Sequence, residues 1–274
     1  MSYASYFISP QDLWGQIGTG HAPSILNVCR REVYDAASGV IPTSVWRKPE
    51  AFRDWVPELS TARPIVVTCR HGHQLSQMIA AELRAGGIPV QVLEGGFHGW
   101  SDAGLPLVSK SALDRFAPQR PSLWVTRRRP KIDRVACPWL IRRFLDADAR
   151  ILYVDPPEVA NTAKETGAVP FDIEGIEISH EGERCSFDTM LKIFGLESEP
   201  HLARLALIVR GADTARYDLA PEAAGLHAVS LGLSALAGDD DHGMIERGFV
   251  VYDALFSWLR QAAEERHNWP AKAA

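Results

Sequence analysis

Short apolar runs alternate with an amphipathic stretch in the first third of the chain. Ser24–Val28, Pro64–Thr68 and Val90–Leu93 are rich in β-branched residues and have the length of strands. Between the last two runs, Leu75–Ala85 places apolar side chains near helical spacing and ends at Gly86, a common helix stop. A strand, a helix and a further strand in succession predict an α/β domain with a central parallel sheet.

The second half of the chain has a mostly helical pattern. Short strands are predicted at Leu123–Thr126 and Ile151–Val154, and a helix is predicted to begin with Cys137 as its N-cap and Pro138 at its first position. Four more helices are predicted at Phe187–Phe194, Pro200–Arg210, Pro221–Ala237 and within His242–Ala263, with Gly195, Gly211 and Gly238 as stops and the acidic residues before His242 as a cap. The pattern predicts a mostly helical α+β fold.

Two domains account for these two patterns. The chain has 274 residues, which exceeds the usual single-domain size of roughly 100 to 200. We predict an α/β domain over residues 1–110 and a linker over residues 111–121, where Pro118 and Pro121 interrupt a polar stretch. Residues 122–274 form the second domain.

Composition narrows the classes of protein. Hydrophobic residues make up 46% of the chain and charged residues 23%, as in a folded globular protein, and the formal net charge of -5 gives no support for nucleic-acid binding. No apolar run approaches the roughly 18 residues of a membrane helix, and we expect no membrane association. The first residues lack the basic and apolar regions of a signal peptide, so we expect a cytoplasmic location. The four cysteines are widely spread without a C-x-x-C pair, so we expect reduced thiols.

The clearest chemical feature is Cys69, which follows a predicted strand and precedes a short loop and a helix. Backbone N–H groups converge at such a loop, and the helix N-terminus favours negative charge. These features stabilise a thiolate and make it nucleophilic. The loop residues Arg70, His71, Gly72, His73 and Gln74 add donors and positive charge that suit an anionic substrate. Read alone, Cys69 also fits a buried structural cysteine.

The loop resembles the active-site loop of the rhodanese family, in which a cysteine opens a six-residue loop and carries a persulfide. A second motif supports the resemblance: L-E-G-G-F-H-G-W at Leu93–Trp100, followed by A-G-L-P, is similar to the sequence near the end of rhodanese domains. The resemblance implies sulfur transfer through Cys69, from a small anionic sulfur donor such as thiosulfate to a thiol acceptor, without a cofactor.

The sequence departs from the family pattern at three places. N-V-C-R stands where D-V-R is usual, V-I-P-T-S where H-I-P-G-A is usual, and Gln74 replaces an arginine that closes the loop. The spacing argues against a phosphatase of the C-x5-R type, because Leu75 occupies the arginine position. Cys29 is either a second thiol that resolves the persulfide or a packed residue at a strand end.

The second domain holds further candidate residues. Arg134 and Cys137 lie in a basic segment, which suggested a second electropositive thiol, either reactive or a helix cap. His180 and Cys185 could supply an imidazole and a thiolate to a metal of unknown identity, with Asp213 or His227 completing the set, although no familiar ligand spacing is present.

The segment from Trp124 to Leu259 resembles the C-terminal domain of ChrB proteins. The resemblance rests on R-P-K-I-D-R-V-A-C-P-W-L-I-R-R-F, V-P-F-D-I, H-E-G-E-R-C-S-F, I-V-R-G-A-D-T and G-F-V-V-Y-D-A-L. It implies a link to chromate resistance, where ChrB proteins are described as chromate-responsive regulators. The N-terminal region usual in ChrB is replaced here by the rhodanese-like segment, which argues against a repressor.

Two functions follow from these resemblances. The first is a sulfurtransferase with a Cys69 persulfide, fused to a ChrB-like domain and linked to chromate resistance. The second is a non-catalytic sensor or regulator that responds to chromate or a metal. Chromate is a tetrahedral dianion like sulfate, so the Cys69 loop is a candidate site for it under either reading.

Overall fold

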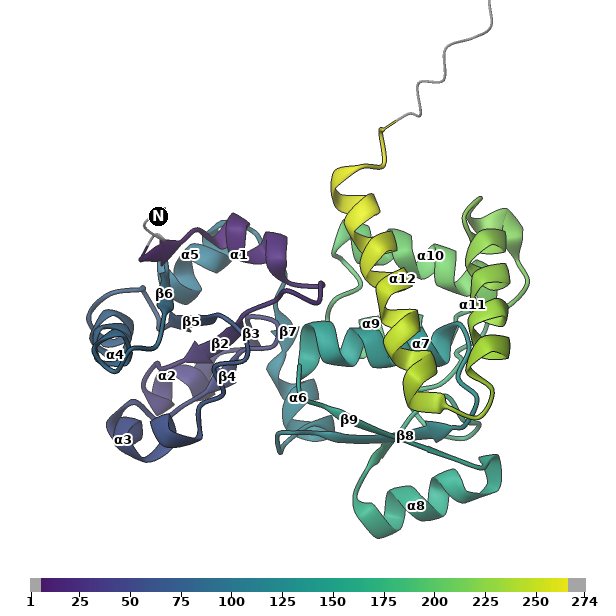
Figure 1. The fold of residues 1–274 in the computed structure, drawn as a ribbon, viewed down its shortest axis with the longest axis horizontal. Helices are drawn as coiled ribbons and strands as arrows, with labels where there is room; N and C mark the ends of the chain where they lie inside the picture. Colours follow the sequence, from purple (N-terminus) through teal and green to yellow (C-terminus); the bar gives the residue numbers. More distant parts are fainter. Residues whose placement is uncertain (1–5, 266–274) are drawn as a thin grey trace, which may run out of the picture.

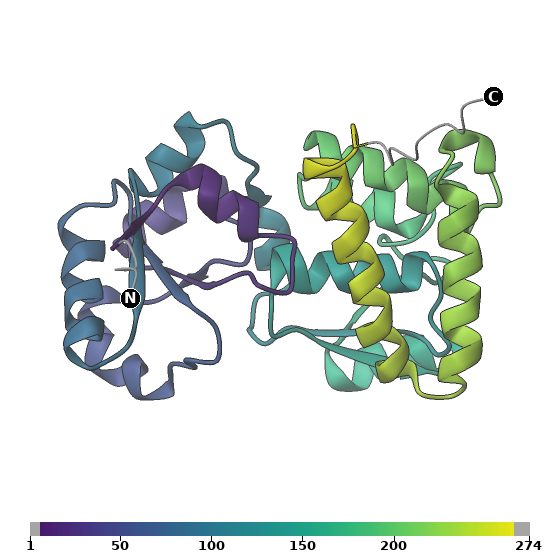
Figure 2. The same ribbon diagram turned by 45° about the horizontal axis from the view of Figure 1, so that its top comes forward.

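The computed structural model describes residues 6–265, and its two halves lie side by side. The α/β half contains the strands and helices up to α5, and the other half contains β8 and the helices from α7 onward (Figure 1). The two halves stay distinct when the molecule is turned (Figure 2).

The first half is built on a five-stranded, all-parallel sheet. Its strand order is β1-β6-β5-β2-β4, and the strands are β1 (Phe7–Ile8), β6 (Val90–Leu93), β5 (Ile65–Thr68), β2 (Ser24–Asn27) and β4 (Val45–Trp46). The three longest strands are the three β-branched runs predicted from the sequence, and the predicted parallel α/β sheet is confirmed.

Helices cover both faces of this sheet. They are α1 (Pro10–Gln16), α2 (Arg31–Ala36), α3 (Phe52–Trp55), α4 (Gln74–Ala85) and α5 (Gly96–Asp102), with 3-10 turns at Pro49–Ala51 and Val56–Glu58. Side chains of β5 alternate between the faces: Ile65 and Val67 pack with α4, whereas Val66 belongs to the core with Leu13 and Trp100. Every β5 side chain is buried, because the strand lies at the centre of a covered sheet.

The stretch predicted as a linker is largely structured. Strands β3 (Gly39–Val40) and β7 (Val108–Ser109) form an antiparallel pair, and helix α6 (Lys110–Phe116) follows directly. The Ser109 hydroxyl caps α6 by accepting a hydrogen bond from the Ala112 N–H. Ala112 and Leu113 are buried, so this helix contributes to the core.

The second half is mostly helical around a small parallel sheet, as predicted. The sheet has the order β10-β8-β9, with β8 (Leu123–Arg127), β9 (Arg150–Val154) and β10 (Val169–Pro170). The helices are α7 (Asp133–Leu140), α8 (Val159–Thr166), α9 (Ser186–Ile193), α10 (Pro200–Asp213), α11 (Ala223–Ala237) and α12 (Asp241–Gln261), with 3-10 turns at Pro156–Glu158 and Tyr217–Leu219. In residues 6–265, no helix has both the length and the apolar character needed to cross a membrane.

The predicted start of the first helix in this half is wrong. Helix α7 begins at Asp133, four residues before Cys137, so Pro138 lies inside the helix and a π-helical turn follows at Ile141–Leu145. An internal proline loses a backbone hydrogen bond and destabilises a helix by about 3 kcal/mol. Val135, Ala136 and Trp139 are almost fully buried, and we attribute the tolerance of Pro138 to this packing.

Gly211 was also misread as a helix stop. It lies within α10, and a Cβ atom there would come within 2.8 Å of the Ala223 Cβ and 2.9 Å of the Arg216 carbonyl oxygen. The glycine therefore allows close packing of the following segment. The prediction that acidic residues cap the last helix is confirmed, because the Asp240 side chain accepts a hydrogen bond from the Gly243 N–H.

One hydrophobic core runs through both halves. Trp14 of α1 makes edge contacts with Trp100, Phe144 and Phe256, at ring-centroid distances of 6.2, 6.2 and 6.4 Å. The Arg260 guanidinium donates hydrogen bonds to the backbone oxygens of Trp14 and Ile17 at 2.7 and 3.0 Å. Burying each such ring contributes about 1.5 to 3 kcal/mol, so the junction stabilises both halves.

Gly18 provides a test of this junction. It has φ +82°, and an added Cβ would lie 2.5 Å from the Phe256 ring and 2.9 Å from the Phe144 ring. Gly87 has the same φ of +82° with nothing within 4 Å of an added Cβ, so Gly87→Ala is a matched control for backbone strain.

We expect Gly18→Ala to melt roughly 2 to 10 °C below Gly87→Ala, because overpacking adds about 1 to 3 kcal/mol of destabilisation. Thermal unfolding followed by circular dichroism measures the difference. Equal melting temperatures would show that the junction does not hold the two halves together.

Candidate active site

Cys69 lies at the carboxyl end of β5, at the start of the loop that leads into α4. The helix begins at Gln74 with His73 as its N-cap, so the predicted arrangement of strand, loop and helix is confirmed. The N-terminus of a helix carries a partial positive charge and free N–H groups. Cys69 as a whole residue is 7% exposed, and its sulfur lies next to Ser76 in the first turn of α4.

Donors around the sulfur outweigh its burial. Burial by itself raises the pKa of Cys69, but hydrogen bonds from the Ser76 hydroxyl and from the backbone N–H groups of Ser76, His71 and His73 lower it below its ordinary value. The Ser76 Oγ lies 3.2 Å from the Cys69 Sγ. The loop therefore favours the thiolate, as the sequence predicted, although Ser76 itself was missed. A small polar residue in the first turn of an otherwise amphipathic helix was the available signal.

The two motifs noted in the sequence pack against each other. The Phe97 N–H donates to the Cys69 carbonyl at 2.9 Å, and the His98 N–H donates to the Arg70 carbonyl at 3.0 Å. Gly96 has φ +59°, and any Cβ there would collide with the Cys69 carbonyl oxygen and the Gly72 nitrogen. The glycine pair after β6 thus fixes the shape of the Cys69 loop.

Arginine and histidine side chains form the exposed rim of the loop. The Arg70 Nε donates to the His98 Nε2 at 3.1 Å, and the His71 ring lies 4.5 Å from the His98 ring and 6.0 Å from the His73 ring. Burial and then the nearby His98 and Arg70 lower the pKa of His71. Gln74 is exposed at the first position of α4. His98, which the sequence analysis did not assign, completes this rim.

A cavity of about 370 Å³ opens beside the rim. Its lining includes Arg70, Phe97 and His98, together with Cys29 and Tyr34. Asn27 pairs with Thr68 in the sheet, so Cys29 and Cys69 follow neighbouring strands at the same edge. Burial and then the charge of Cys69 raise the pKa of Cys29 to about 11, which makes Cys29 a poor nucleophile near neutral pH.

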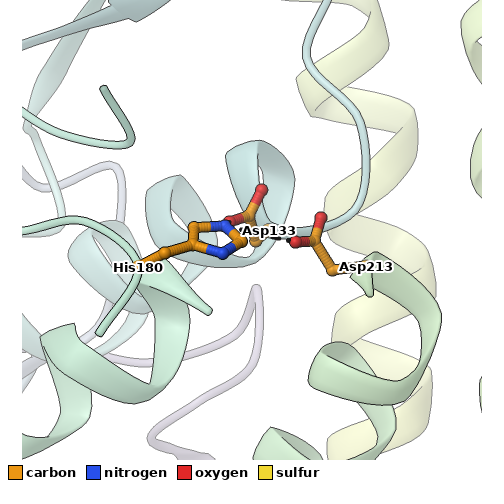
Figure 3. Close-up of side chains that lie close together, drawn as sticks. All are labelled: Asp133, His180 and Asp213. Atoms are coloured by element: carbon orange, nitrogen blue, oxygen red, sulfur yellow. Dashed lines mark hydrogen bonds and ion pairs between the residues drawn. The ribbon is translucent and has the colours of Figure 1, made fainter. Parts of the chain in front are cut away.

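A second group of polar side chains converges in the other half of the molecule. Asp133 begins α7, Asp213 ends α10, and His180 lies on the loop before α9 (Figure 3). The His180 Nε2 lies 3.2 Å from an Asp133 oxygen, 3.3 Å from an Asp213 oxygen and 3.6 Å from an Asp172 oxygen. His180 and Asp213 were predicted candidates. Asp133 and Asp172 were missed, although both lie in motifs quoted from the sequence.

The carboxylates in this group influence one another strongly. Burial and then the charge of Asp133 raise the pKa of Asp213 to about 7. Burial raises the pKa of Asp133, but the hydrogen bond and charge of His180 overcome this and lower it. The predicted candidate Arg134 pairs with Asp172, with its Nε 3.2 Å from the carboxylate, and Arg127 lies 2.7 Å from the same oxygen.

The interpretation of Cys137 as an electropositive thiol at a helix start is wrong. Cys137 is fully buried within α7, and burial followed by the charges of Asp133 and Asp172 raises the pKa of its thiol well above the ordinary value. The neighbouring guanidinium of Arg134 is directed to Asp172 instead. Cys137 is therefore a core residue.

Two of the candidate metal ligands lie outside the group. Cys185 is fully buried as the N-cap of α9, in a capping box with Asp188, and burial raises the pKa of its thiol well above the ordinary value. The His227 Nδ1 lies 3.0 Å from the Ala212 carbonyl oxygen. The described residues that bring metal-ligating atoms within 4.8 Å of one another are Asp133, His180 and Asp213.

Comparison with protein families agrees with this division of the chain. Residues 9–103 match the rhodanese-like domain, and residues 124–259 match the ChrB C-terminal domain. The chain thus carries a rhodanese-like domain followed by a ChrB C-terminal domain.

A curated relative and several solved structures are similar to parts of the chain. Protein ChrB from Cupriavidus metallidurans is 37% identical over 134 residues, which are 49% of this chain and 40% of the relative, so the chain spans well under half of that protein. A rhodanese-like domain protein from Staphylococcus aureus is 24% identical over 37% of this chain and 97% of its own, with a TM-score of 0.33. A thiosulfate sulfurtransferase from Pseudomonas aeruginosa is 30% identical over 39% of this chain and 20% of its own, with a TM-score of 0.31.

Replacing Ser76 tests the origin of the low Cys69 pKa. Ser76→Ala removes the hydroxyl that lies 3.2 Å from the sulfur, so we expect the pKa of Cys69 to rise and its alkylation at neutral pH to slow. Iodoacetamide labelling of the Cys69 peptide across a pH series, read by mass spectrometry, measures this. In the wild type the rate falls only as the pH drops through the lowered pKa.

Ser198→Ala, on an exposed turn of the other half, is the control and should leave the profile unchanged. An unchanged profile in Ser76→Ala as well would mean that the hydroxyl does not stabilise the thiolate.

The glycine contact between the two motifs gives a second test. Gly96→Ala places a Cβ against the Cys69 carbonyl, so we expect the loop to shift and the fast alkylation of Cys69 to disappear. Gly104 has φ +66°, close to the +59° of Gly96, but nothing lies within 4 Å of an added Cβ there. Gly104→Ala should therefore keep the fast reaction, and similar rates in both variants would contradict the proposed role of Gly96.

Proposed function

We propose that the protein is a sulfurtransferase that carries a persulfide on Cys69. The observation that carries the proposal is the ring of donors around the sulfur: the Ser76 hydroxyl at 3.2 Å, the backbone N–H groups of His71 and His73 in the loop, and that of Ser76 in the first turn of α4. These donors favour the thiolate of Cys69 over its thiol and can then hold a negatively charged persulfide in the same place. The match of residues 9–103 to the rhodanese-like domain supports the proposal.

In the first step the Cys69 thiolate attacks the outer sulfur of a small anionic donor such as thiosulfate. A bond forms between the Cys69 sulfur and that outer sulfur, while the bond between the two sulfur atoms of thiosulfate breaks and sulfite leaves with the electron pair. Arg70 and the histidines at the rim lie where they can attract the dianion and neutralise the leaving group.

In the second step an acceptor thiolate or cyanide attacks the outer sulfur of the persulfide. The new bond to the acceptor forms as the sulfur–sulfur bond to Cys69 breaks, and the Cys69 thiolate is restored. The proposed transfer needs no cofactor, and its two half-reactions predict ping-pong kinetics. The cavity beside Arg70 and His98 has room for a small acceptor.

The ChrB C-terminal domain links this proposed activity to chromate resistance. Chromate shares its tetrahedral shape and double negative charge with sulfate, so the Cys69 loop is also a candidate chromate site. We place both the sulfur transfer and the binding of chromate in the rhodanese-like half. A sensor without catalysis is the alternative that the following experiment distinguishes.

We expect purified protein to convert thiosulfate and cyanide to thiocyanate and sulfite, and Cys69→Ser to lose this activity entirely. Mass spectrometry of the wild type after incubation with thiosulfate alone should find one added sulfur on the Cys69 peptide.

Cys185→Ser is the matched control, because serine also serves as a helix N-cap and the thiol is far from the loop in the sequence. It should retain both the activity and the persulfide. If neither appears in the wild type with thiosulfate or other sulfane-sulfur donors, a binding or sensing role replaces the proposed transfer.

A further inference from the structure

We propose that Asp133, His180 and Asp213 bind a divalent transition-metal ion in the ChrB-type half, at a site separate from Cys69. The three side chains come from distant parts of the chain, and each offers one ligand atom within 4.8 Å of the others. Figure 3 shows the imidazole and the two carboxylates turned toward one another.

The spacing of the ligand atoms matches a coordination sphere. The His180 Nε2 is 3.2 Å from the Asp133 oxygen and 3.3 Å from the Asp213 oxygen. Ligands placed about 2.1 Å from one ion, at octahedral or tetrahedral angles, are separated by about 3.0 to 3.4 Å. His180 already lies at this spacing from both carboxylates, and the two carboxylate oxygens lie within 4.8 Å of each other, so binding an ion needs only small movements of these side chains.

The charge balance of the group also favours a cation. Three acidic side chains, Asp133, Asp172 and Asp213, surround one imidazole. Both nearby guanidinium groups, of Arg127 and Arg134, pair with Asp172. Among the ion pairs of residues 6–265, those of Asp133 and Asp213 are with His180 alone. Asp213 and Asp133 also form a side-chain hydrogen bond with each other. Buried carboxylates are normally paired or bound to a metal, and an ion would take the place of the proton that these two carboxyl groups share.

The site is open on one side. A cavity of about 320 Å³ has Asp172 and His180 in its lining, together with Arg127, Glu174 and Ser179 among other residues. The His180 side chain is 44% exposed, whereas that of Asp133 is 4% exposed. An ion would therefore bind to the buried Asp133 on its inner side and enter from the cavity next to His180. Remaining coordination positions can be filled by water or by a small anion attracted by Arg127.

The ligand types select the kind of ion. One imidazole nitrogen and two carboxylate oxygens suit Mn²⁺, Fe²⁺ or Zn²⁺, whereas Ca²⁺ and Mg²⁺ prefer oxygen ligands throughout. The two cysteines of this half lie outside the group, so a thiolate-rich zinc or copper site does not arise here. The set replaces the predicted pair of His180 and Cys185 with His180 and two aspartates.

Titration of the full chain with Mn²⁺ and with Zn²⁺ tests this site. The Cys69→Ser background is used so that the reactive thiol cannot bind metal, and the protein is first stripped with a chelator. We expect one equivalent of ion by isothermal titration calorimetry and a higher melting temperature with the ion present. Asp213→Asn and His180→Ala should each weaken binding by at least about tenfold.

Glu174→Gln is the matched control, because it removes an exposed carboxylate from the same cavity without touching the three ligands. It should bind the ion as tightly as the parent. His180 is partly exposed, so His180→Ala should fold normally, and circular dichroism of the stripped variants checks this. The proposal is overturned if the parent binds neither ion, or if Asp213→Asn and His180→Ala bind as well as Glu174→Gln.

Discussion

The two halves of the protein depend on the aromatic contacts that join them. Trp14 of the first half packs between Trp100 of its own domain and Phe144 and Phe256 of the other, while Arg260 reaches back to the Trp14 carbonyl. This junction belongs to a core that also includes Trp139 and Tyr252. Because one face of the five-stranded sheet packs into this shared core, the face that carries Cys69 and α4 is left to form its own smaller cluster.

The Cys69 loop and the His180 cluster favour charges of opposite sign. At Cys69, neutral hydrogen-bond donors and the start of a helix favour an anion in a partly exposed loop, with arginine and histidine at the rim. In the ChrB-type half, carboxylates converge on a histidine in a largely buried setting that favours a cation. The two halves therefore differ in the charge that their polar clusters favour, an anion at Cys69 and a cation at His180.

Sequence reasoning worked well where function depends on neighbouring residues. The Cys69 loop, its strand and its helix are contiguous, and local rules for strand ends and helix starts place them correctly. It failed where burial overrides local preference. Pro138 indicated a helix start, yet the helix begins five residues earlier, at Asp133, where Val135 and Trp139 are buried, and Cys137 lies buried within it. Gly211 indicated the end of a helix, yet it lies inside α10, where the absence of a side chain lets Ala223 and the Arg216 carbonyl pack close to the helix.

The sequence by itself determined the α/β character of the first half, the mostly helical second half, and the position of Cys69 between a strand and a helix in a rhodanese-like domain. These features follow from the periodicity of apolar residues and from motifs whose residues are close together in the sequence. Only the tertiary structure decided that Gly96 shapes the Cys69 site, and that Asp133 and Asp213 meet at His180. The physical reason is that these residues lie far apart in the sequence and come together only when the chain folds. The spacing of residues along the chain therefore does not predict the contacts.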